Sequence, residues 1–157
     1  MDRSNTYSLP ERRGSRPETN RNLPHSQVSQ IAPSEMQEAL FARAASLPGV
    51  QVGRSLVSLP QTRAFHLDPQ VATGPREAFQ AGTEFAHLHH AGDGSLHMML
   101  PAEVAAEAAA KGWTEPHPIG PGVVLVYGPR DHEEVEVVWS LLEASHRWAA
   151  TGDGAAA

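Results

Sequence analysis

Two short segments, residues 84–90 and 95–100, restrict the possible folds of this chain more than any other feature. Apolar and polar residues largely alternate in both segments, which is typical of β-strands that bury one face. The segment between them, residues 91–94, reads Ala-Gly-Asp-Gly, and these residues favour a tight hairpin turn. The sequence therefore predicts an antiparallel hairpin with one face in a core.

The turn also predicts how the two strands pair. A three-residue loop over residues 92–94, with its last glycine in the left-handed region, suits this sequence. It would place His89 directly opposite His97. On the apolar face, Leu88 would then lie opposite Met98. A two-residue loop would mix apolar side chains and imidazoles on both faces, so the hydrophobic pattern argues against it. The second face would carry Phe85, His87, His89, His97 and Met99.

The other elements follow from hydrophobic periodicity and from signals at helix ends. Residues 34–47 have helical spacing, with Ser34 as the N-cap and Gln37 completing a capping box. An alanine-rich helix is predicted at 101–111, and a last helix begins after the cap residue Asp131. Strands are expected at 50–57, 63–67 and 122–127, in addition to the hairpin. The predicted order is α-β-β-β-β-α-β-α, an α+β fold whose mostly antiparallel sheet has helices packed on it.

Only the middle of the chain is expected to form this domain. The N-terminal residues contain few large apolar side chains and many charged ones. They cannot bury enough surface to offset the entropy of ordering, roughly 1–2 kcal/mol per residue for the backbone. We therefore predict a disordered tail over residues 1–32, a single domain over 33–150 and a disordered end over 151–157.

Composition argues against several classes of function. The net charge is −6 and the basic residues form no clustered face, so a nucleic-acid partner is not expected. The chain has no cysteine, which excludes disulfides, thiolate metal sites and a cysteine nucleophile. It also lacks the run of about 20 apolar residues that a membrane helix needs. Without that run or a signal-peptide pattern, the sequence predicts a cytoplasmic protein with no membrane partner.

The second face of the hairpin is the candidate site. His87 and His89 point the same way from one strand, and His97 would reach them across a strand spacing of roughly 5 Å. Three imidazole nitrogens suit Zn, Fe, Cu or Ni and leave a position open for water or substrate. Candidates for a fourth ligand or a general base are His117, Glu84 and Glu115.

Other interpretations of these residues remain open. The histidines could line a metal-free pocket, or they could be solvated or hydrogen-bonded side chains without a role in binding. Arg130 stands just before the last predicted helix, where it could hold a carboxylate or phosphate beside the helix N-terminus. Alternatively, Arg130 pairs with Asp131 or Glu134 at the surface.

Six short motifs occur in order along the second half of the chain. They are Glu-Phe-Ala-His at 84–87, Gly-Ser-Leu-His at 94–97, Lys-Gly-Trp at 111–113, Glu-Pro-His-Pro at 115–118, Val-Tyr-Gly-Pro-Arg at 126–130 and Val-Trp-Ser-Leu-Leu-Glu-Ala-Ser at 138–145. Together they resemble the luciferase-domain family, small bacterial and fungal proteins, over about residues 33–150. The chain is too short for the barrel of the flavin-dependent luciferases. The resemblance implies that His87, His97, His117 and Arg130 match the family pattern, that His89 is not part of it, and that the source is bacterial.

The leading hypothesis is a small enzyme or ligand-binding domain whose partner is a small organic molecule. His97 and His117 would be catalytic, and Arg130 and Glu84 would bind the ligand. The expected metal ligands are His87, His97, His117 and His89. Metal-assisted or histidine acid/base chemistry fits these side chains.

The alternative hypothesis is a non-catalytic interaction or oligomerisation module, which would include a homo-oligomer. A concave and covered histidine face would favour a pocket, whereas a flat and exposed one would favour an interface.

Overall fold

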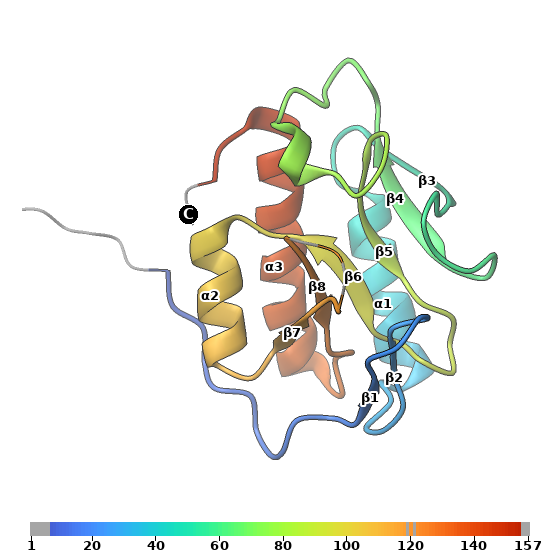
Figure 1. Cartoon of the computed structure of the whole chain (residues 1–157), viewed down its shortest axis with the longest axis vertical. Helices are drawn as coiled ribbons and strands as arrows, with labels where there is room; N and C mark the ends of the chain where they lie inside the picture. The colour runs from blue at the N-terminus through green and yellow to red at the C-terminus, as the bar shows by residue number, and fades with distance from the viewer. Residues whose placement is uncertain (1–6, 119, 121, 155–157) are drawn as a thin grey trace, which may run out of the picture.

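A six-stranded antiparallel sheet forms the centre of the molecule (Figure 1). The computed structural model describes residues 7–118, 120 and 122–154. The strands are β3 (Val50–Arg54), β4 (Arg63–Leu67), β5 (Glu84–Leu88), β6 (Leu96–Met99), β7 (Thr114–Pro116) and β8 (Val123–Val126), in the spatial order β3-β4-β5-β6-β8-β7. The predicted α+β class is confirmed. The strand β7, which the sequence analysis did not predict, is added at one edge of the sheet.

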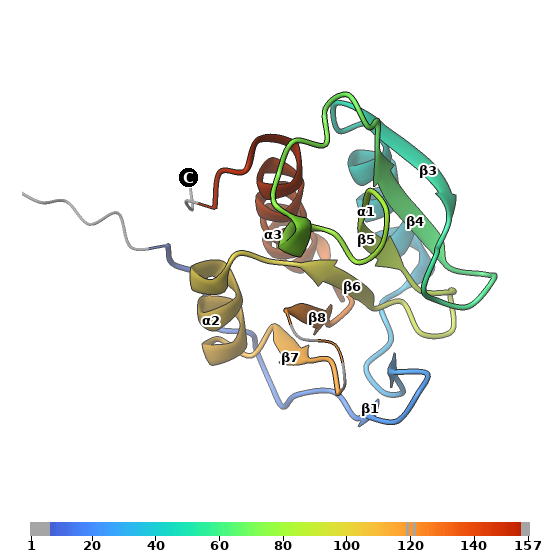
Figure 2. The same cartoon turned by 45° about the horizontal axis from the view of Figure 1, so that its top comes forward.

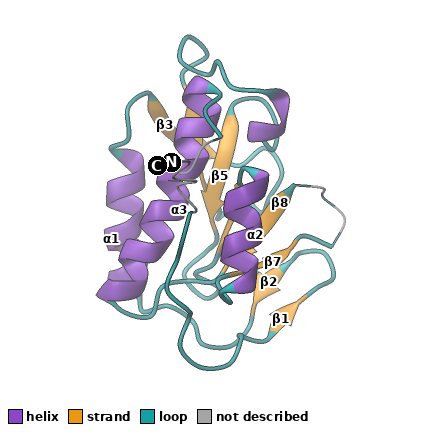
Figure 3. Cartoon of the chain, turned by 90° about the vertical axis from the view of Figure 1, so that its left-hand side faces the viewer, coloured by secondary structure: helices purple, strands orange, loops and turns teal. Residues whose placement is uncertain are grey.

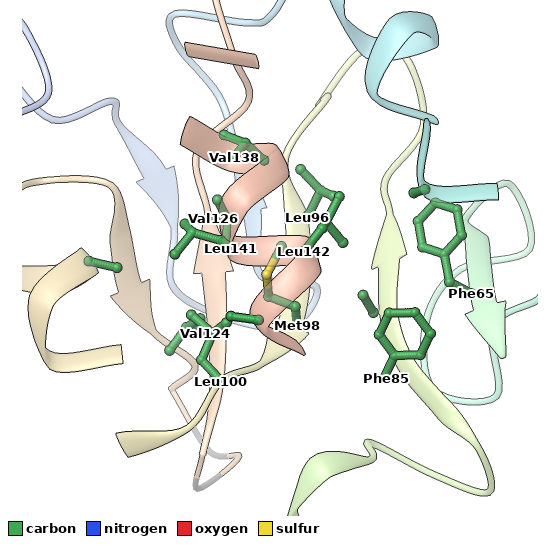
Figure 4. Packing of buried hydrophobic residues seen from close by; sticks show 14 of the residues in the cluster. Phe65, Phe85, Leu96, Met98, Leu100, Val124, Val126, Val138, Leu141 and Leu142 are labelled. Carbon is green, nitrogen blue, oxygen red and sulfur yellow. The ribbon is translucent and has the colours of Figure 1, made fainter. Parts of the chain in front are cut away.

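Three helices cover one face of this sheet (Figure 3). They are α1 (Ser34–Ala45), α2 (Ala102–Ala110) and α3 (His132–Thr151), and a short 3-10 helix, η1 (Arg76–Ala78), precedes β5. Apolar side chains from the strands meet α3 in a buried core that includes Phe65, Phe85, Leu96, Met98, Leu141 and Leu142 (Figure 4). The helices thus fill the apolar side of the sheet and leave the histidine side to other parts of the chain. None of the described helices is long and apolar enough to cross a membrane.

A bulge in β5 decides which of its side chains face the core. The pairing of β4 with β5 shifts by one residue between Phe65 and His66, which leaves Phe85 as the extra residue of β5. Phe85 therefore enters the core, where its ring centroid lies 6.4 Å from that of Phe65. Glu84 turns to the other side and joins His87. The prediction that Phe85 shares the histidine face is wrong, because an alternating pattern without a bulge was assumed.

The hairpin of β5 and β6 is displaced by two residues from the predicted register. His97 lies opposite His87 rather than opposite His89. The turn is wider than predicted, because the His90 carbonyl accepts hydrogen bonds from both Asp93 N and Gly94 N, each at 2.9 Å. Gly94 is left-handed, as predicted, with φ of 71°. A shift by an even number of residues keeps every side chain on its own face. The histidines therefore still lie together.

Gln37 holds the turn instead of capping α1. The predicted capping box is absent, since α1 follows Pro33 without a side-chain cap. The buried amide of Gln37 donates to the carbonyls of Ala32, at 2.8 Å, and Ala91, at 3.0 Å. Ala91 belongs to the β5–β6 turn, so this side chain fixes the turn against the start of α1.

The N-terminal segment packs on the domain, so the predicted disorder over residues 1–32 is wrong for residues 7–32. It runs past α2 and β7 to a small hairpin of β1 (Thr19–Asn20) and β2 (Ser26–Gln27) (Figures 1 and 2). The indole of Trp113 donates to the Pro10 carbonyl at 2.7 Å. Residues 1–6 lie outside the described residues. At the other end, α3 continues to Thr151, and residues 155–157 also lie outside the described ones.

The N-terminal segment has no core of its own, and arginine side chains attach it to the domain. Arg16 donates to the carbonyls of Thr114, at 2.7 Å, and Ala109, at 2.6 Å. The Arg12 guanidinium is nearly buried and lies 5.3 Å from the centroid of the Tyr127 ring. Charged side chains therefore attach the segment to the domain together with the few apolar ones, such as Leu9, that join the core.

Candidate functional site

Five histidines gather on the sheet face opposite the helices and form one group, the histidine cluster. It consists of His25, His87, His89, His97 and His117. All five line a cavity of about 1250 Å³. Four of them are buried, and His117 is partly exposed. The cavity gives the histidine face a concave shape.

His97 lies at the centre of the cluster. Its Nδ1 atom is 3.2 Å from His87 Nε2 and 3.0 Å from His89 Nε2. Its other nitrogen, Nε2, is 3.0 Å from His25 Nδ1. The ring of His117 lies at a centroid distance of 5.1 Å from the ring of His97. Both nitrogens of one central imidazole therefore face the nitrogens of other histidines.

A carboxylate stands behind each of the three histidines that touch His97. Glu84 lies 2.8 Å from His87 Nδ1, and Glu115 lies 2.8 Å from His25 Nε2. Behind His89, the Nδ1 atom meets Asp93 at 3.2 Å and Ser95 Oγ at 2.9 Å. Carboxylates in these positions hold the ring proton on the outer nitrogen. The inner nitrogens, which face His97, are then free of protons in the neutral rings.

Burial sets the charge of the central rings. It lowers the pKa of His87 and His97, and the neighbouring histidines lower the pKa of His97 further. Burial raises the pKa of Glu84, but hydrogen bonds from His87, Leu56 and Ser55 outweigh it and the pKa is lowered overall. At neutral pH the imidazoles of His87 and His97 are therefore neutral, and the Glu84 carboxylate behind His87 is ionised.

His117 differs from the other members of the cluster. The backbone N–H of Gly120 donates to its Nδ1 atom at 3.0 Å. The neutral ring must then carry its own proton on Nε2. Burial lowers the pKa of His117, and the nearby His25 lowers it further. The predicted catalytic pair His97 and His117 is thus brought together, with His117 as a neutral hydrogen-bond donor at the cavity wall.

Glu84 does not occupy the predicted ligand-binding position. Its side chain is completely buried and does not line the cavity. Besides His87, it accepts hydrogen bonds from Ser55 Oγ at 2.8 Å and Leu56 N at 2.7 Å. The bulge in β5 places it behind His87, so Glu84 orients this histidine and does not face the cavity.

Arg130, predicted as an anion anchor, is also absent from the residues that line the cavity. Its guanidinium binds the buried carboxylate of Glu134, with Nε at 2.9 Å. It also donates to the carbonyl of Arg13 at 2.8 Å. The alternative that the sequence left open, pairing with Glu134, describes this arginine. Arg130 therefore links α3 to the N-terminal segment.

Replacing Arg130 with alanine is expected to lower the free energy of unfolding by about 2 kcal/mol, because Glu134 loses its charged partner while remaining buried. The partly exposed guanidinium keeps this value below that of a fully buried pair. Urea unfolding measures the change. The matched control is Arg13→Ala, which removes the exposed pair with Asp131 and should cost less than about 1 kcal/mol. Equal losses in the two variants would contradict this assignment.

The rim of the cavity is apolar. Three exposed side chains, Leu23, Val57 and Leu59, lie at this rim. Met99 and Phe79 add further apolar surface. A cavity with an apolar rim and a few convergent polar groups is typical of a site for small organic molecules.

His25 is the member of the histidine cluster that the sequence did not predict. It lies between β1 and β2, strands of two residues each, which are too short to show a periodic pattern. Asp93 was identified only as a turn residue, although it also supports His89. The closeness of His25 to the hairpin depends on the packing of the N-terminal segment, and no local signal marks it.

Comparison with known proteins identifies relatives of this chain. A family model described as the luciferase domain matches residues 82–145. A luciferase from Armillaria ostoyae is 32% identical over 159 aligned positions, covering 87% of this chain and 59% of that protein. A luciferase from Neonothopanus nambi is 41% identical over 70 positions, covering 40% of this chain and 26% of that protein. No solved structure matches.

The chain spans about 59% of the length of the luciferases from Armillaria ostoyae and Armillaria gallica. The matched relatives named here come from fungi, which contradicts the predicted bacterial source.

Proposed function

Because this chain belongs to the luciferase-domain family, we propose that it is an enzyme domain that binds a small organic molecule over the histidine cluster and converts it there. The observation that carries the proposal is the position of the cluster. Five imidazoles converge at one cavity, and carboxylates orient three of them from behind. Such an arrangement of titratable groups in a concave site is typical of an active site.

The histidines supply acid/base groups in this proposal. His117 lines the cavity and can exchange a proton with the bound molecule. His97 lies beside it and is connected through His25 to the carboxylate of Glu115. This buried chain can stabilise positive charge that develops on the central ring, as an orienting carboxylate does for a catalytic histidine.

The cavity favours a ligand that is largely apolar. Its volume, about 1250 Å³, exceeds the usual range of roughly 300–1,000 Å³ for small-molecule sites. Apolar residues at the rim would contact the body of the ligand, and the histidines would meet its polar reacting atoms. The relatives are named luciferases, so luciferase activity is the first reaction that we propose for this chain.

The alternative function, a non-catalytic interaction or oligomerisation module, requires a flat and exposed histidine face. Buried histidines around a concave cavity favour the enzyme instead. A cytoplasmic location and a homo-oligomeric state stay predictions.

Incubation with the luciferin of the Armillaria enzymes tests the proposed function. We expect the luciferin to bind by calorimetry and to be consumed, with light as a second readout. Met99→Trp, which fills the cavity, should weaken binding at least about 10-fold, since a pocket that has lost its space loses its contacts. Val28→Trp is the matched control, because Val28 is exposed and does not line the cavity. Absent binding, or equal binding by both variants, would contradict the proposal.

A further inference from the structure

We propose that His87 Nε2, His89 Nε2 and His97 Nδ1 form a binding site for a divalent first-row transition-metal ion. The inference deepens the proposed function and rests on it in one respect, because the open side of the metal site would be the place of reaction. The geometry, the ring protons and the charges of the cluster support the metal site independently of that function.

The distances among the three nitrogens fit a common ion. His97 Nδ1 is 3.2 Å from His87 Nε2 and 3.0 Å from His89 Nε2. The three atoms all lie within 4.8 Å of one another. Metal–imidazole bonds of roughly 2.0–2.1 Å, at angles between octahedral and tetrahedral, place two ligand nitrogens about 2.9–3.4 Å apart. The rings are thus near the separation that coordination requires.

The outer nitrogen of each ligand already has an acceptor for its proton. His87 Nδ1–H can donate to Glu84, and His89 Nδ1–H can donate to Asp93. His97 Nε2–H can donate to His25 Nδ1, whose own Nε2–H then reaches Glu115. Ligand histidines in metal sites almost always donate their second N–H to such a partner. All three histidines here follow that pattern.

An ion at this position also resolves a shortage of protons. With the outer nitrogens of His87, His89 and His25 protonated, three inner lone pairs face His97. A neutral His97 has one ring proton, so it can donate a hydrogen bond from Nδ1 or from Nε2 but not from both. A metal ion on Nδ1 accepts the lone pairs of His87 and His89 and leaves the proton of His97 for His25. Without the metal, hydrogen bonds on both sides of His97 need one further proton, on either His25 or Glu115.

The buried charges point to a divalent cation. Glu84 and Asp93 are both buried, and among the residues that the structure describes their ionic partners are His87 and His89 alone. Two buried carboxylates beside the ligand rings place negative charge in the interior, where uncompensated charge is costly. An ion of charge +2 balances them. Neutral nitrogen ligands favour Zn, Fe, Cu or Ni over Mg or Ca.

The second possible trio, His25, His97 and His117, fits less well. Gly120 N–H donates to Nδ1 of His117, so the neutral ring has its proton on Nε2. Neither nitrogen of His117 then offers a lone pair to an ion. A metal on this side would also leave His87 and His89 competing for the single Nδ1–H of His97. We therefore assign His117 to the cavity wall and not to the metal, and in this the proposal departs from the predicted role of His117 as a metal ligand.

Cobalt titration of the full chain, after treatment with EDTA, tests this site. We expect one Co²⁺ per chain, with visible d–d absorption and displacement by Zn²⁺. His89→Phe and His97→Phe keep the ring volume and should weaken Co²⁺ binding at least about 100-fold. His117→Phe should change it less than about 3-fold. Glu84→Gln should weaken it about 10–100-fold, as for other supporting carboxylates.

Two controls separate loss of the site from loss of the fold. His132→Ala removes an exposed histidine at the start of α3 and should leave Co²⁺ binding unchanged. Circular dichroism identifies any variant that fails to fold, and Glu84→Gln then takes its place in the comparison. Absent Co²⁺ binding by the folded wild-type chain overturns the proposal, as does binding that depends on His117 and not on His89.

The same samples distinguish this inference from the proposed function. If EDTA-treated protein still consumes the luciferin and binds no Co²⁺, the result supports the proposed enzyme and contradicts the metal site. If Co²⁺ binds through His89 and His97 but no luciferin is bound, the result supports the metal site and contradicts the proposed function.

Discussion

Replacing His97 with alanine is expected to lower kcat/KM of the proposed luciferase reaction by about 10³-fold, within the range known for catalytic acid/base groups. His97 touches three other histidines through its two ring nitrogens. Its loss removes the central group of the site and leaves the nitrogens of those rings without a common partner. No other single residue in the cluster has so many of these contacts.

Two further substitutions show which side of the His97 ring is needed. Asparagine can place a polar atom near the position of Nδ1, and glutamine near that of Nε2. If the contacts to His87 and His89 dominate, His97→Asn should retain more activity than His97→Gln. His25→Ala acts through His97 and should cost about 10–100-fold, as supporting residues do. If folded His97→Ala protein has the same kcat/KM as the wild type, the histidine cluster does not take part in the reaction.

The sequence was sufficient to predict the central hairpin and its histidine face. Alternation in residues 84–90 and 95–100 identified both strands, and the left-handed Gly94 was predicted from the turn. The register was displaced by two residues because the width of a turn depends on contacts such as that of Gln37 with Ala91. The error was harmless to the site, since an even displacement preserves the faces.

The bulge at Phe85 could not be read from the pattern. Phe85 and His87 are two residues apart, so alternation alone assigns them to one face. Only the pairing with β4 shows that Phe85 is the extra residue and that Glu84 moves behind His87. The role of Glu84 changed for this reason, from a predicted ligand contact to a support of His87.

The N-terminal segment shows a second limit of sequence reasoning. Low apolar content predicts disorder when a segment must build its own core. This segment instead uses Arg12 and Arg16 to bind backbone and aromatic groups that the domain already presents. His25 reaches His97 only through that packing. A histidine supplied by such a segment has no local signature.

The free energy of unfolding of EDTA-treated protein is expected to decrease steeply as the pH falls below 6.5. Burial lowers the pKa of His87 and His97 from the ordinary value of 6.5. Below pH 6.5 the unfolded chain binds a proton at each of these two histidines, and the folded chain does not. The stability that depends on the two neutral rings is therefore fully present above pH 6.5 and is lost as the pH falls. Each such proton changes the free energy of unfolding by about 1.4 kcal/mol per pH unit. A loss of roughly 2–3 kcal/mol is therefore expected between pH 6.5 and 5.5.

Urea unfolding at pH 7.5, 6.5 and 5.5 measures this loss. His97→Phe removes one of the two buried titrating groups, so the dependence on pH below 6.5 should be about half that of the wild type. His132→Ala, which removes an exposed histidine, should keep the wild-type dependence. The lowered pKa values of Glu84 and Asp93 add their effect only below about pH 4.5, outside this window. A free energy of unfolding that stays constant from pH 7.5 to 5.5 would mean that the buried rings accept protons in the folded state. The cluster would then be charged in mild acid, and its rings could not act there as the neutral ligands that metal binding requires.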